Sequence, residues 1–150
     1  MKTMVSEVEL IYKTRVKPSD RATVTQSKDA YNIFKSVYDF NKIEHKEMMY
    51  AMYLNNAKKV FAVLLISEGG ITGTVSDMRV IFQGALKTNA TGIILSHNHP
   101  TGNMKASATD IALTKQVKDA GKILNIELCD HLIISPEDGQ YLSMADEGII

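Results

Sequence analysis

Two histidines, His97 and His99, stand two residues apart, directly before Pro100. Residues 91–96 read as a short buried strand that leads straight into them. Side chains at positions i and i+2 of an extended chain point to the same side, so both imidazoles can face one point. Because imidazole nitrogens bind divalent metals such as zinc, the pair allows a metal site. The alternative is a polar loop that carries two surface histidines.

Asp110 lies near the start of a helix predicted over residues 107–121. At helical spacing it shares a face with the apolar side chains of Leu113, Val117, Ala120 and Leu124. A carboxylate turned toward a protein core is costly unless a positive group meets it, and a cation held by the two histidines would do so. The alternative is a capping box, in which Ser107 and Asp110 only satisfy free backbone amides at the helix start.

The complete pattern is more specific than its parts. His97-x-His99, seven intervening residues and then Ser107-x-x-Asp110 match the signature of the JAMM metalloprotease family, also called MPN+ or JAB. The segments at residues 95–102, 110–114 and 128–134 resemble the RadC branch of that family. The likeness extends from about Tyr31 to Tyr141. The chain is interpreted as a short form without the helix-hairpin-helix segment that many RadC proteins carry ahead of this domain.

The resemblance implies a zinc ion bound by His97, His99 and Asp110, with water in the fourth position. It also calls for a glutamate on an upstream strand, and Glu47 fits that place better than its neighbour Glu44. Glu47 would then act as general acid and base, and the Ser107 hydroxyl would stabilise the developing oxyanion. The implied reaction is hydrolysis of a peptide or isopeptide bond in an unidentified peptide or protein.

Three further polar residues are candidates for orienting the ligand histidines: Asn98, Asp130 and His131. For His131 the sequence leaves three roles open. These roles are a packed strand residue, a partner of a ligand histidine and a fourth ligand.

Strand and helix patterns alternate along the chain and must position these residues. Strands are expected at residues 5–13, 47–54, 60–66, 71–75, 91–96, 126–134 and 141–143. Helices are expected after a cap at Ser27 or Asp29 to about Phe40, over 78–87 after a cap at Ser76 or Asp77, and over 107–121. This order predicts one mixed-sheet domain of the α/β (α+β) class flanked by helices, spanning residues 1–150 with a core at about 27–143. The resemblance implies the cytidine-deaminase-like architecture of JAMM domains.

Composition limits the other functions that can be considered. The 17 basic and 17 acidic residues cancel, so no basic excess indicates nucleic-acid binding. The single cysteine, Cys129, excludes an internal disulfide or a multi-cysteine zinc site. No apolar run is long enough to cross a membrane or to act as a signal peptide, so a cytoplasmic protein is expected. Two rival hypotheses remain: a RadC-like protein associated with DNA repair, and a catalytically silent JAB scaffold for protein interactions.

Overall fold

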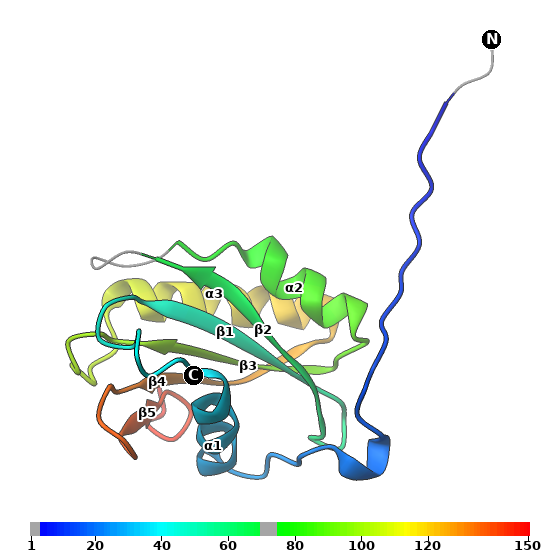
Figure 1. Ribbon diagram of the computed structural model, residues 1–150. Coiled ribbons are helices and arrows are strands. Elements are labelled where there is room, and N and C mark those ends of the chain that lie inside the picture. The colour runs from blue at the N-terminus through cyan, green and yellow to red at the C-terminus, as the bar shows by residue number, and fades with distance from the viewer. Residues whose placement is uncertain (1–3, 70–74) are drawn as a thin grey trace.

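The computed structural model describes residues 4–69 and 75–150, and in these residues five strands form one mixed sheet (Figure 1). The strands are β1 (Met48–Leu54), β2 (Val60–Glu68), β3 (Gly92–Asn98), β4 (Glu127–Ile134) and β5 (Tyr141–Ser143). Their order across the sheet is β2-β1-β3-β4-β5. The β3–β4 pair is parallel, and the other neighbouring pairs are antiparallel. The predicted mixed α/β fold is therefore confirmed.

Helices cover both faces of this sheet. The covering helices are α1 (Ser27–Val37), α2 (Met78–Lys87) and α3 (Ala108–Leu124), and an exposed 3-10 helix, η1 (Pro18–Asp20), precedes them in the chain. Helix α1 lies against one face, and α2 and α3 lie against the other (Figure 1). Among the described residues, no helix is both long and apolar enough to cross a membrane.

The side chains of β3 alternate between the two cores. Ile94 packs in the core that contains α1, whereas Ile93 and Leu95 pack in the core that contains α2 and α3. Because the side-chain period of a strand is two, Asn98 faces the α1 side and His97 faces the α2 and α3 side. The same rule places Glu47, Met49 and Ala51 of the neighbouring chain segment on the His97 side. The sheet thus brings Glu47 and His97 to one face.

The predicted first strand, at residues 5–13, is wrong. The segment from residue 4 to 15 has no regular secondary structure, and its apolar side chains are largely exposed, for example Val8 and Leu10. Tyr12 contacts the body through a hydrogen bond from its hydroxyl to the Phe61 carbonyl and an edge-on contact with the Phe61 ring, and the arm leads away from the body (Figure 1). An alternating pattern forms a strand only where a neighbouring strand accepts its backbone groups. The strand expected at residues 71–75 lies outside the described residues except for Val75, which is not in a strand.

Two predicted helix ends also differ. Helix α1 ends at Val37 rather than Phe40, because Tyr38 is extended and its hydroxyl bonds to Ser96 on β3. Helix α3 continues past Gly121 and ends at Leu124, where Asn125 adopts a left-handed conformation with φ of 56°. Gly121 does not end the helix. A glycine is needed at this position because the helix packs closely against the following chain. A Cβ there would lie 2.2 Å from the Ile126 carbonyl oxygen.

Candidate metal centre

His97 and His99 leave the carboxyl end of β3 on the same side of the sheet. His97 pairs with Met49 in the β1–β3 ladder, and its side chain is fully buried. His99 lies one residue beyond β3, but its backbone amide still donates to the Ile134 carbonyl at 3.3 Å. That bond keeps the chain extended through His99. Both rings therefore point to one place, as the i, i+2 spacing predicts.

Asp110 reaches this place from the first turn of α3 while it also caps the helix. Its amide donates to the Ser107 hydroxyl oxygen at 3.0 Å, and its carboxylate accepts from the Ser107 amide at 2.9 Å. The capping box is therefore present, and the same carboxylate faces the two histidines. The two readings of Asp110 are not alternatives, because the cap fixes the direction in which the carboxylate points.

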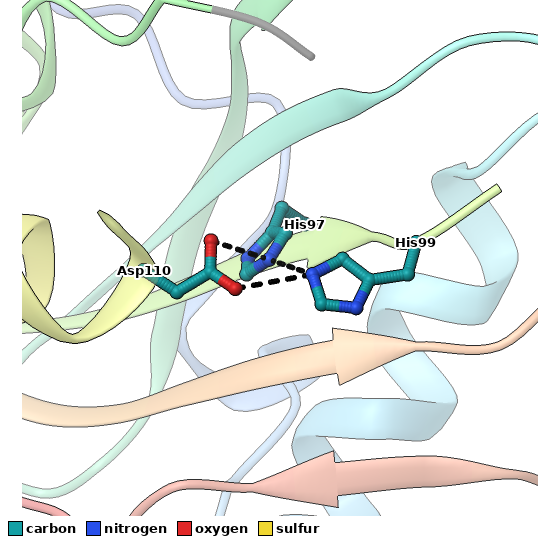
Figure 2. Close-up of side chains that lie close together, drawn as sticks. All are labelled: His97, His99 and Asp110. Carbon is teal, nitrogen blue, oxygen red and sulfur yellow. Dashed lines mark hydrogen bonds and ion pairs between the residues drawn. The ribbon is translucent and has the colours of Figure 1, made fainter. Parts of the chain in front are cut away.

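The three side chains form a compact cluster of ligand atoms (Figure 2). The Nε2 atoms of His97 and His99 are 3.0 Å apart. His97 Nε2 lies 3.2 Å from Asp110 Oδ1, and His99 Nε2 lies 3.1 Å from Asp110 Oδ2. Any two ligand atoms of a tetrahedral zinc site are about 3.3 Å apart when the metal–nitrogen bonds are about 2.0 Å. The donor set and its spacing therefore fit a zinc ion.

The charges in the cluster depend on one another. Burial raises the pKa of Asp110, but the imidazoles of His97 and His99 beside its carboxylate outweigh burial and hold the pKa well below its ordinary value. The hydrogen bond with Asp110 raises the pKa of His99, against the opposing effect of burial. A carboxylate that stays ionised beside two imidazoles is the charge pattern that a divalent cation needs.

A cleft of about 640 Å³ opens beside the cluster and is lined by His99, Asp110, Ser107 and Glu47. Glu47 directly precedes β1 instead of opening it, and its carbonyl accepts from the Gly69 amide at 2.8 Å. That bond fixes the backbone of Glu47 beside the end of β2. Glu44, the competing glutamate, is exposed in the preceding turn and does not line the cleft.

Asn98 faces away from the cluster, on the α1 side of β3. Its side-chain amide donates to the carbonyls of Ile43 and Lys46 at 2.8 Å each, and its oxygen accepts from the Met48 amide at 2.7 Å. The side chain therefore holds the loop that leads into Glu47 and does not contact the ligand rings.

Asp130 also faces the α1 side of the sheet. It accepts from the Ser143 hydroxyl at 2.6 Å and from the Ala145 amide at 3.0 Å. These bonds join β4 to the chain around β5, away from the ligand histidines.

His131 lies directly behind His97. Its Nε2 is 2.7 Å from His97 Nδ1, its Nδ1 is 2.7 Å from the Thr114 hydroxyl, and its ring is fully buried. Burial holds its pKa well below the ordinary value. Sequence reasoning did not single out Thr114, although it stands four residues after Asp110 on the inward face of α3.

A mixed sheet with helices on both faces, and a His-x-His and Asp cluster at the end of a central strand, is consistent with a JAB/MPN domain. The RadC-like JAB domain family matches residues 24–149, so the chain belongs to that family.

Curated relatives agree with this assignment. A UPF0758 protein of Flavobacterium johnsoniae is 42% identical over 126 residues, which are 84% of this chain and 53% of the relative. A UPF0758 protein of Porphyromonas gingivalis is 38% identical over 130 residues, covering 87% of this chain and 56% of the relative. One from Clostridium perfringens is 36% identical over 140 residues, covering 93% and 60%. The chain therefore spans a little over half the length of these relatives.

Proposed function

We propose that this protein is a zinc-dependent hydrolase of the JAMM type that cleaves a peptide or isopeptide bond. The observation that carries the proposal is the cluster of His97, His99 and Asp110, whose ligand atoms lie 3.0–3.2 Å apart at the side of a cleft that also contains Glu47. Two imidazoles and one carboxylate leave one corner of a tetrahedral zinc open. That arrangement is typical of catalytic zinc and not of structural zinc.

A zinc ion held by His97, His99 and Asp110 would supply Lewis acidity and would lower the pKa of the attacking water toward about 7. Glu47 takes the proton of the attacking water and passes it to the leaving nitrogen, which is the role of a general acid and base. The Ser107 oxygen already accepts a hydrogen bond from the Asp110 amide, so its own hydrogen is free to be donated into the cleft. Ser107 thereby stabilises negative charge on the substrate carbonyl oxygen.

The metal part of the proposal is tested by Asp110→Ala, with Asp29→Ala as its control. Asp29 occupies the same capping-box position in α1, where its carboxylate accepts from the Gln26 and Thr25 amides. Both variants lose a cap worth about 1 kcal/mol. Only Asp110→Ala loses zinc in elemental analysis after dialysis. Equal zinc content in both variants and the wild type would mean that Asp110 is a cap and nothing more.

The hydrolytic part is tested by Glu47→Gln, with the exposed Glu44→Gln as its control. The substrates are quenched fluorescent peptide libraries, one with main-chain amide bonds and one with lysine isopeptide branches. We expect cleavage by the zinc-loaded wild type and by Glu44→Gln, and at least a 100-fold lower rate for Glu47→Gln with zinc retained. A zinc-loaded wild type that cleaves neither library would favour the silent scaffold instead.

A further inference from the structure

A line of hydrogen bonds runs from helix α3 through the buried interior to the back of the metal centre. It starts at the Asp110 backbone carbonyl, passes the Thr114 hydroxyl and the His131 ring, and ends at His97 Nδ1. The three donor–acceptor distances are 2.6, 2.7 and 2.7 Å. The direction of this line can be worked out, because its first member can only accept.

The Thr114 hydroxyl has one hydrogen and gives it to the Asp110 carbonyl. The other acceptor near this hydroxyl, the Met144 sulfur at 3.4 Å, is weaker and more distant. In either case the hydroxyl oxygen presents a lone pair to His131 Nδ1. His131 Nδ1 must therefore carry the proton of this neutral ring.

A neutral imidazole with its proton on Nδ1 has a bare Nε2. The bare Nε2 of His131 accepts from His97 Nδ1 at 2.7 Å, so His97 also carries its proton on Nδ1. His97 Nε2 is then bare as well, and it is the atom that faces His99 and Asp110. The proton position on each ring is thus set by the preceding hydrogen bond. The first bond is set by the Asp110 backbone carbonyl, which can only accept.

We propose that Thr114 and His131 are positioning residues that fix the tautomer of His97, so that its Nε2 presents a lone pair to the metal. The inference rests on the proposed zinc site. With the opposite tautomer, a hydrogen on His97 Nε2 would occupy the place of the cation. Groups that hydrogen-bond to a ligand histidine set its tautomer and its orientation.

His99 keeps a proton on its Nδ1 by another route. Its Nδ1 lies 2.5 Å from the Asn103 backbone carbonyl, which can only accept. A backbone carbonyl of the local turn therefore sets the proton on His99 Nδ1, whereas His97 depends on Thr114 and His131. A substitution remote from the metal can therefore weaken His97 as a ligand.

The first test uses Thr114→Val, which keeps the shape of the side chain but removes the oxygen, and Thr114→Ser, which keeps the hydroxyl. Zinc affinity is measured at pH 8 by competition with a chromophoric chelator. We expect a 10- to 100-fold loss for Thr114→Val and less than a threefold change for Thr114→Ser. His131→Phe fills the ring volume without a nitrogen and should resemble Thr114→Val. Equal affinities for the valine and serine variants would overturn the inference.

The second test needs no variant and no zinc. Long-range ¹H–¹⁵N correlation spectra of the metal-free, ¹⁵N-labelled protein at pH 8 report which ring nitrogen carries the proton. We expect the Nδ1–H form for both His97 and His131, and an Nε2–H form of His97 would overturn the inference. If the wild type binds no zinc, the proposed function fails, while these spectra still decide whether the bond chain sets the tautomer.

Discussion

The polar side chains on the two faces of β3 have different kinds of hydrogen-bond partners. On the α1 side, Asn98 makes three hydrogen bonds to backbone groups, and the Ser96 hydroxyl bonds to Tyr38 at 2.9 Å. On the other side, the partners of His97 Nε2 among the described residues are the neighbouring His99 nitrogen and an Asp110 carboxylate oxygen. The first face is satisfied within the protein, whereas the second gathers acceptor atoms around one point.

This difference separates structural polar groups from groups that need a ligand. Buried polar groups are normally paired, and a cluster of lone pairs that the protein does not pair is unfavourable without a proton or cation among them. Both faces belong to one short strand, so they share the same backbone and the same burial. Their different partners therefore decide their roles, and substitutions on the two faces should affect different measurements.

The largest effect is expected from His97→Gln on the metal side. It removes one of the three proposed ligands, so zinc affinity should fall on the order of 1000-fold in a chelator competition assay. The free energy of unfolding of the metal-free protein, measured with urea, should change much less than the free energy of zinc binding. Zinc affinity within tenfold of the wild type would show that the two faces do not differ in this way.

Asn98→Ala should produce the opposite result. It removes three buried hydrogen bonds, so the metal-free protein should lose about 2–4 kcal/mol of unfolding free energy. Zinc affinity should stay within about tenfold, because Asn98 does not touch the ligand rings. Turnover should fall, since the loop before Glu47 is no longer held. If Asn98→Ala had the same free energy of unfolding in urea as the wild type, the structural role of this face would be contradicted.

Only the metal side should respond to pH near neutrality. Because the hydrogen bond to Asp110 raises the pKa of His99, a proton occupies this ring at a pH where free imidazole has lost it. Zinc must displace that proton, so its affinity should fall about tenfold per pH unit as the pH drops through the raised pKa.

The same proton has the opposite effect on the metal-free fold. The contribution of His99 to stability is present below its unfolded pKa of about 6.5 and is lost as the pH rises through the raised folded value.

Chelator competition between pH 8.5 and 6, compared for the wild type and His99→Gln, checks the zinc prediction. A flat affinity across this range for the wild type would contradict it.

Tyr38→Phe should give the smallest effect. It removes the hydrogen bond to Ser96 on the α1 side but keeps the ring, so about 1 kcal/mol of unfolding free energy should be lost. Zinc affinity should not change. A change in zinc affinity as large as that in stability would show that the two faces are coupled through β3.

Local patterns determined much of the molecule. The helix at residues 78–87 and the strand at 141–143 lie as predicted, because caps, turns and periodicity act over a few residues. The convergence of His97 and His99 follows from strand geometry alone. The arm at residues 5–13 was mispredicted as a strand, since an alternating pattern does not say whether a partner strand lies beside it.

Tertiary structure alone decided which polar residues lie behind the cluster of His97, His99 and Asp110. In β4 the pairing with β3 shifts by one residue after Leu128, so that Asp130 pairs with Ile94 and His131 pairs with Leu95. Without that irregularity, strict alternation would turn His131 to the face opposite Leu128, away from His97. The cluster of His97, His99 and Asp110 could be predicted from the sequence, because the spacing of these residues belongs to one strand, one turn and one helix start. The residues behind them could not, because their positions depend on how separate elements pair and pack.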